Sequence, residues 1–102
     1  MKRILQTIGV RPDCFDAYCD LHDHIWPDVA DAISRANLEN YSIFHLNGNL
    51  YQYMEYTGTD LEADMAALAE SEAMLRWCSI CKTMQLPDTG VWSDAIEVFH
   101  LP

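Results

Sequence analysis

The sequence predicts an α+β fold of the ferredoxin-like type, a sandwich in which helices cover one face of an antiparallel sheet. Two observations predict it. Segments in which apolar residues alternate are followed by segments in which they recur every three or four residues. The order of these segments is strand, helix, strand, strand, helix, strand, which is βαββαβ. The length of 102 residues suits one domain over 1–102 with a single core.

The first predicted elements are a strand and a long helical region. Residues 3–10 alternate loosely and predict the strand, after which Asp13 is the expected N-cap of a helix. From Phe15 to about residue 36, apolar residues recur at helical spacing. Pro27 lies inside this pattern, so it either kinks the helix or begins a second helical piece.

The middle of the chain gives the clearest hairpin signal. Residues 41–46 and 50–56 are rich in aromatic and branched side chains and flank Asn47-Gly48-Asn49. Large apolar groups occupy both alternating sets of positions, although helices are expected to cover only one face. An exposed apolar sheet face usually marks an interface, so we predict a homodimer that pairs two sheets. The alternative is a set of aromatic rings lying singly on a solvated face.

The second half predicts further helices and a final strand. Thr59 with Glu62 has the spacing of a capping box, which would begin a second helical region. Ser71 is expected to cap another helix that runs to about Met84. A loop over residues 87–90 follows, and residues 95–101 are predicted to form the last strand.

The charge of the chain narrows its range of partners. Sixteen Asp and Glu residues against six Lys and Arg give a net charge of −10. This charge repels phosphate backbones and anionic lipids, so we expect no nucleic-acid and no membrane partner, and a neutral small molecule is favoured. No apolar run approaches the ~20 residues of a membrane span, and the N-terminus lacks the apolar core of a signal peptide. These features predict a cytoplasmic protein.

The four cysteines are expected to be free thiols in a reducing cytosol. Cys78 and Cys81 have C-x-x-C spacing, and with Cys14, Cys19 or a neighbouring histidine they could in principle form a zinc site. However, Cys14 and Cys19 are five positions apart, and Cys78 and Cys81 fall in the middle of a helical pattern. We therefore predict small buried apolar side chains and no metal site.

The most unusual polar residues of the first helical region are Tyr18 and His22. They are four positions apart on the same stripe as Ile25, so both are expected to point at the sheet. A buried polar group without a hydrogen bond costs roughly 1–3 kcal/mol. One interpretation is therefore a hydrogen-bonded core pair. The other is a small cavity between helix and sheet, in which histidine transfers protons because its ordinary pKa lies near neutrality.

Two further aromatic residues could complete such a cavity. Tyr41 begins the second predicted strand; its ring either closes the cavity on the helix side or packs in a dimer on the other face. Trp77 lies on an inward-facing stripe of the last helix. It is either a core residue or a platform for the apolar face of a sugar ring.

A combination of motifs identifies a family that the chain resembles. The residues that match are Pro12-Asp13, Tyr18, His22, Ile25-Trp26-Pro27, Asn40-Tyr41, Trp77, Glu97-Val98-Phe99 and Leu101-Pro102. They run nearly end to end, and together they resemble the L-rhamnose mutarotases, small enzymes of bacterial sugar catabolism. This resemblance implies a dimeric α+β barrel of ferredoxin-like subunits and an isomerase that needs no cofactor.

The resemblance also implies roles for individual residues. His22 would be the proton donor, while Tyr18 and Tyr41 would bind the sugar. Trp77 matches the second of two adjacent tryptophans that contact the sugar, and Arg76 replaces the first. An arginine there exchanges a stacking surface for hydrogen-bond donors to hydroxyls, so L-fucose or another deoxyhexose is an alternative to L-rhamnose. A non-catalytic sugar-binding protein and a small monooxygenase of the same architecture also remain open.

Overall fold

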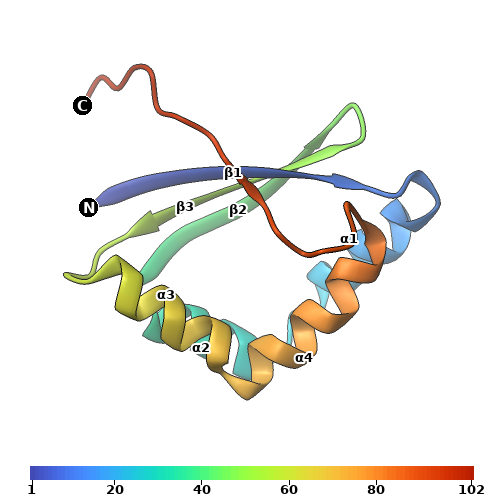
Figure 1. The fold of residues 1–102 in the computed structure, drawn as a ribbon, viewed down its shortest axis with the longest axis horizontal. Helices are drawn as coiled ribbons and strands as arrows, with labels where there is room; N and C mark the ends of the chain where they lie inside the picture. The colour runs from blue at the N-terminus through green and yellow to red at the C-terminus, as the bar shows by residue number, and fades with distance from the viewer.

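One antiparallel sheet with four α-helices on a single face forms the fold (Figure 1). The computed structural model describes all of residues 1–102. The strands are ordered β2-β3-β1-β4, and the short β5 also pairs with β1. The element bounds are β1 Lys2–Val10, α1 Phe15–Asp23, α2 Pro27–Arg35, β2 Leu38–Leu46, β3 Asn49–Tyr56, α3 Leu61–Glu70, α4 Glu72–Cys81, β4 Gln85–Leu86 and β5 Ser93–Asp94. This arrangement confirms the predicted α+β, ferredoxin-like class.

Pro27 divides the first helical region into two helices rather than kinking one. α1 ends at Asp23, and Pro27 occupies the first position of α2, where its missing N–H would have no helical partner in any case. Trp26 is extended (φ −69°, ψ 135°), as expected for a residue that precedes proline. Because of this break, the apolar residues of α1 and α2 do not form the single inward-facing stripe that the sequence predicts. Ile25 is 45% exposed, while Val29 on α2 is fully buried.

The helix caps differ from the sequence prediction at two of three positions. Asp13 lies inside a 3₁₀ turn over Pro12–Cys14 and makes no capping hydrogen bond, so that prediction is wrong. The predicted Thr59 capping box is also wrong, because the Asp60 carboxylate accepts the Ala63 N–H at 3.1 Å and caps α3. The Ser71 cap of α4 is confirmed by its bond to the Met74 N–H at 3.3 Å.

The predicted hairpin is confirmed, and it contains an irregularity that the sequence did not reveal. Asn47 and Gly48 both have positive φ (51° and 81°), as a type I′ turn requires. The register between β2 and β3 shifts between Glu39 and Ser42, where Asn40 has a φ of 49°. This bulge inserts one residue into β2. Tyr41 faces the helices with Ile43, two positions further along β2, and the bulge brings Leu38 to the same face.

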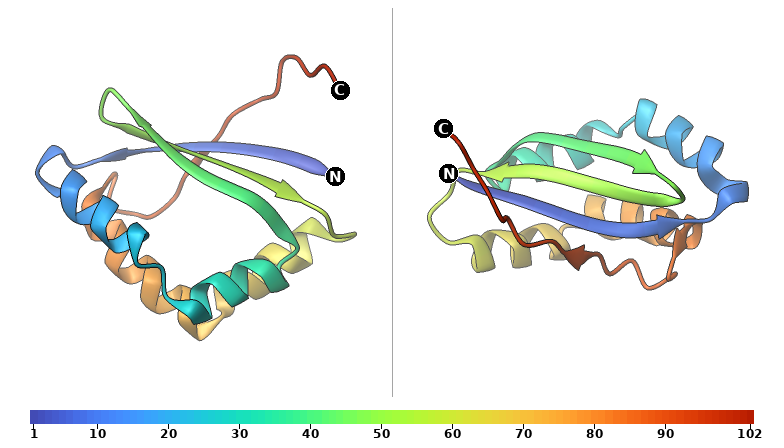
Figure 2. Two further views of the ribbon diagram at one scale, coloured as in Figure 1. Left: turned by 180° about the vertical axis from the view of Figure 1, so that it is seen from behind. Right: turned by 90° about the horizontal axis from the view of Figure 1, so that it is seen from above.

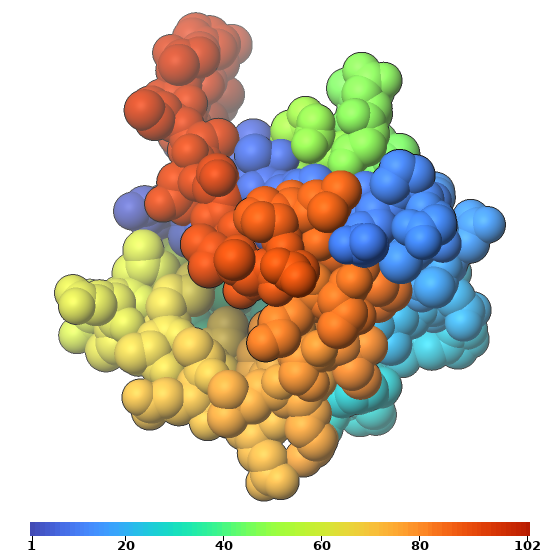
Figure 3. Space-filling view, turned by 45° about the vertical axis from the view of Figure 1, so that its right-hand side comes forward, coloured from blue at the N-terminus to red at the C-terminus, as the bar shows by residue number.

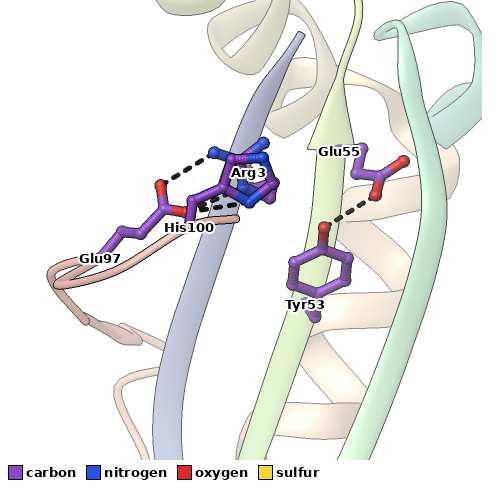
Figure 4. Close-up of polar contacts among 5 residues, drawn as sticks. All are labelled: Arg3, Tyr53, Glu55, Glu97 and His100. Carbon is purple, nitrogen blue, oxygen red and sulfur yellow. Dashed lines mark hydrogen bonds and ion pairs between the residues drawn. The ribbon is translucent and has the colours of Figure 1, made fainter. Parts of the chain in front are cut away.

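The predicted strand over 95–101 is wrong. The edge of the sheet beyond β1 is formed by β4 and β5, of two residues each. The last backbone bond to β1 is donated by the Ala95 N–H to the Leu5 carbonyl, at 2.9 Å. Beyond it the chain leaves the sheet on the side away from the helices (Figures 1 and 2). Past Ala95, the Arg3–Glu97 ion pair, at 2.9 Å, connects the C-terminal segment (residues 96–102) to β1 (Figure 4).

No helix of the fold has both the length and the apolar character needed to cross a lipid bilayer.

Candidate active site

A cavity of about 540 Å³ lies between the inner face of the sheet and the helices. Its mouth is the hollow between α3, α4 and the chain around residues 90–95 (Figure 3). The lining is mostly apolar, and its only residues charged at neutral pH are Lys2, Arg3 and Asp94. Such a cavity, with a few convergent polar groups, is typical of a small-molecule site. The polar and aromatic lining residues used below are Tyr18, His22, Tyr41, Gln52, Trp77 and Gln85.

Tyr18 and His22 meet in the wall of this cavity, as their spacing on one helix predicts. Their rings stack with centroids 4.2 Å apart, and the imidazole Nδ1 lies 2.8 Å from the Tyr18 carbonyl oxygen. A carbonyl can only accept, so Nδ1 carries a hydrogen and Nε2 is the nitrogen that titrates. Burial lowers the pKa of His22 below its ordinary value, with a smaller opposing effect from the bond to the Tyr18 carbonyl. The ring is therefore neutral at pH 7.

Trp77 also packs against the imidazole. Its indole meets His22 edge to face, with ring centroids 5.1 Å apart, and meets Trp26 in the same way at 5.0 Å. Trp77 is only 6% exposed and belongs to the core cluster that contains Tyr18. The indole is thus a core residue that also lines the cavity, while its role as a platform for a sugar ring stays a prediction.

The two tyrosine hydroxyls have opposite hydrogen-bond roles. The Gln85 amide Nε2 donates to the Tyr18 hydroxyl at 3.2 Å, so the Tyr18 proton remains available to a ligand. The Tyr41 hydroxyl instead donates to Gln52 Oε1. Burial raises the pKa of both phenols, which keeps both protonated at neutral pH. Because Tyr41 lines the cavity and bonds Gln52, its two alternatives are resolved in favour of the cavity.

Arg76 is not brought together with the other predicted site residues. Its guanidinium lies on the surface, 2.9 Å from the Asp28 carboxylate and 3.0 Å from that of Glu72. One step along a helix turns a side chain by about 100°, so Arg76 points away where Trp77 points in. The position of Arg76 makes it a link between α2 and α4, outside the cavity lining.

Sequence reasoning missed the glutamines of the cavity. Gln52 and Gln85 are buried, and Gln6 lies half-buried on β1. A signal was present. Gln6 interrupts the inward-facing positions Ile4 and Ile8 of β1, and Gln52 occupies an inward-facing position of β3. A polar residue at such a position has to find a partner.

The cysteines divide between core and surface. Cys81 is buried in the cavity wall, and burial raises the pKa of its thiol to about 12, so the thiol stays protonated. Cys14 is half-buried, but Cys19 and Cys78 are exposed, so their prediction as buried apolar side chains is wrong. No three His, Cys, Asp or Glu side chains come close enough together to hold one metal ion.

The fold and the cavity together define a class: a small α+β protein with one histidine among aromatic rings, suited to acid–base chemistry on an uncharged polar ligand. Comparison with known proteins is more specific. The family model described as L-rhamnose mutarotase matches residues 3–101. The chain therefore belongs to the L-rhamnose mutarotase family, whose members are isomerases that interconvert anomers.

Individual relatives agree with this assignment, and solved structures share the fold. The chain is 33% identical over 104 residues to the L-rhamnose mutarotase of Pectobacterium carotovorum and 30% identical over 106 residues to that of Bacillus subtilis. Each alignment covers 99% of this chain and 99% of the relative. The crystal structure of the L-rhamnose mutarotase of Formosa agariphila superposes with a TM-score of 0.84 over both full chains, at 21% identity. An antibiotic biosynthesis monooxygenase shares the fold alone, with a TM-score of 0.62, 17% identity and coverage of 95% of this chain and 100% of that one.

Proposed function

We propose that this protein interconverts the α and β anomers of L-rhamnose, with His22 as the acid–base group. Family membership supports the reaction class. The observation that carries the assignment of His22 is its geometry. The Tyr18 carbonyl holds Nδ1, and the ring lines a cavity of about 540 Å³ beside two phenols and an indole.

The proposed chemistry follows from what mutarotation requires. The pyranose opens when its ring oxygen gains a proton and its anomeric hydroxyl loses one, so the hemiacetal C–O bond breaks. The C1–C2 bond then rotates, and the ring closes on the other face of the carbonyl. His22 relays the proton: its unprotonated Nε2 takes the proton from the anomeric hydroxyl and delivers it to the ring oxygen, which is bonded to the same carbon. Tyr18 and Tyr41 hold sugar hydroxyls. Burial lowers the pKa of His22 and makes its protonated form a stronger acid.

Replacing His22 tests the assignment. One positioned acid–base group contributes about 10²–10⁴-fold, so His22→Asn should slow anomer exchange by that factor. Saturation-transfer NMR between the two anomers of L-rhamnose measures the exchange rate directly. His24→Asn is the matched control, because His24 is exposed at the end of the same helix. Full activity in His22→Asn, with the fold intact by circular dichroism, would refute the role of His22.

The same measurement on a panel of sugars decides the substrate. L-Fucose and other deoxyhexoses are included, although Arg76, which replaces a tryptophan of the resemblance, lies outside the cavity lining. A sugar that binds without faster exchange of its anomers would indicate a binding protein. The shared fold of the monooxygenase carries no weight for that activity here.

We further propose that the working unit is a homodimer. Two apolar surfaces support it: the outer face of β2, where Phe44 and Leu46 are 62% and 60% exposed, and the C-terminal segment. Phe99 in that segment is 78% exposed. A second copy of the chain would cover both surfaces. Phe44→Glu should then shift the molar mass from dimer to monomer in light scattering, and an unchanged dimer would place the interface elsewhere.

We propose a cytoplasmic location. The four unpaired thiols suit a reducing compartment, and the net charge of −10 disfavours nucleic acid and anionic membranes as partners.

A further inference from the structure

A chain of hydrogen bonds connects the hydroxyl of Tyr41 to the surface. The Tyr41 hydroxyl donates to Gln52 Oε1. Gln52 Nε2 donates to Gln6 Oε1 at 2.7 Å, and Gln6 Nε2 donates to the Asp94 carboxylate at 2.8 Å. The four side chains come from β2, β3, β1 and β5, and Gln6 and Asp94 are register partners.

Asp94 sets the direction of every bond in this chain. An ionised carboxylate can only accept, so Gln6 must present its NH₂ group to Asp94 and its oxygen to Gln52. Gln52 must then direct its NH₂ group to Gln6 and its oxygen to Tyr41. The Tyr41 proton is held by Gln52 in consequence, and only the lone pairs of its hydroxyl are left to face a ligand.

We propose that Asp94, Gln6 and Gln52 are positioning residues that fix Tyr41 as a hydrogen-bond acceptor for one hydroxyl of the sugar. Tyr18, which receives the bond from Gln85, keeps its proton for donation. The cavity therefore presents one acceptor phenol and one donor phenol to a ligand. The consequence for catalysis rests on the proposed function, whereas the hydrogen-bond order itself is a property of the free protein.

Substitutions of Asp94, at the exposed end of this chain of hydrogen bonds, test the order. Asp94→Asn can accept or donate, so it permits both orders. Asp94→Lys can only donate, and it favours the reversed order, in which Gln52 donates to Tyr41 and the Tyr41 proton faces the cavity. Asp88→Lys is the matched control, because the substitution makes the same change in charge and Asp88 lies exposed in the loop after β4. Asp94 is itself exposed, so these variants should fold.

The first readout is the ¹³Cζ chemical shift of tyrosine in the free protein, which responds to whether the phenol donates or accepts. We expect the Tyr41 resonance to move in Asp94→Lys, to move less in Asp94→Asn, and to stay in place in Asp88→Lys. The Tyr18 resonance should not move in any of them. An unchanged Tyr41 resonance in Asp94→Lys would overturn the proposal, whether or not the protein is a mutarotase.

The second readout is the kinetics of anomer exchange with L-rhamnose. Loss of one hydrogen bond that is made equally in ground and transition states raises KM by about 3- to 10-fold and leaves kcat unchanged. We expect this for Asp94→Lys, and a smaller rise for Asp94→Asn. Both effects should vanish in a Tyr41→Phe background. If they persist there, Asp94 contacts the sugar directly and the positioning role is refuted; a wild type without exchange activity would instead refute the proposed function.

Discussion

Replacing Trp77 with leucine should loosen the packing around His22 and raise its pKa. The indole makes two edge-to-face contacts, with His22 at 5.1 Å and Trp26 at 5.0 Å. Each such pair contributes about 0.5–1.5 kcal/mol, so Trp77→Leu should lower the free energy of unfolding by about 2 kcal/mol through these contacts. For a domain of this size that lowers Tm by about 10 °C.

The effect on His22 has a definite sign. Burial is the largest cause that lowers the pKa of this imidazole, and Trp77 covers one side of it. Water that replaces the indole stabilises the protonated ring, so the pKa should rise toward the ordinary value near 6.5. An NMR titration of the imidazole Cε1–H measures it, with exposed His24 as the internal control. A pKa of His22 that stays constant or falls would refute the account of its environment.

Three further predictions concern stability. Because burial lowers the pKa of His22 in the folded chain, the unfolded chain takes up this proton at a higher pH than the folded chain does. The free energy of unfolding should therefore fall as the pH drops through about 6.5. Urea titrations should show a smaller fall in His22→Asn. Asp60→Ala should cost about 1 kcal/mol through the lost cap of α3, whereas Thr59→Ala should be near neutral; equal losses would contradict the cap assignment. Val29→Ala, at a fully buried position, should cost about 2 kcal/mol in chemical denaturation, against less than about 0.5 for exposed Val91→Ala.

Local signals in the sequence predicted much of the fold. The i, i+4 spacing of Tyr18 and His22 placed both on one side of α1, and neither residue depends on a distant segment for that geometry. Pro27 and the Asn47-Gly48 pair act through their own backbone preferences. They therefore predicted an interruption of the first helical region and a turn between two strands. These features are determined within a few residues, which is why one sequence was enough.

The remaining features depend on partners far along the chain. Gln52 reaches Gln6 across 46 positions, and no local pattern identifies that pair. Arg76 was predicted to contact the ligand with Trp77, but adjacent residues of a helix point in different directions, and Arg76 lies outside the cavity lining. Alternation over 95–101 indicated a strand, yet a strand also needs a neighbouring edge, and pairing with β1 ends at Ala95.

The bulge at Asn40 has a consequence for how related sequences are aligned. Without that extra residue, every side chain of β2 before it would change faces, because strand side chains alternate with a period of two. A relative that lacks the insertion would keep a tyrosine at position 41 on the cavity side and turn the side chain at position 38 away from the helices. Comparison at this point should therefore allow a one-residue gap and follow the face that each side chain occupies. The length of this strand segment, as much as the identity of its residues, decides which side chains complete the core beside the cavity.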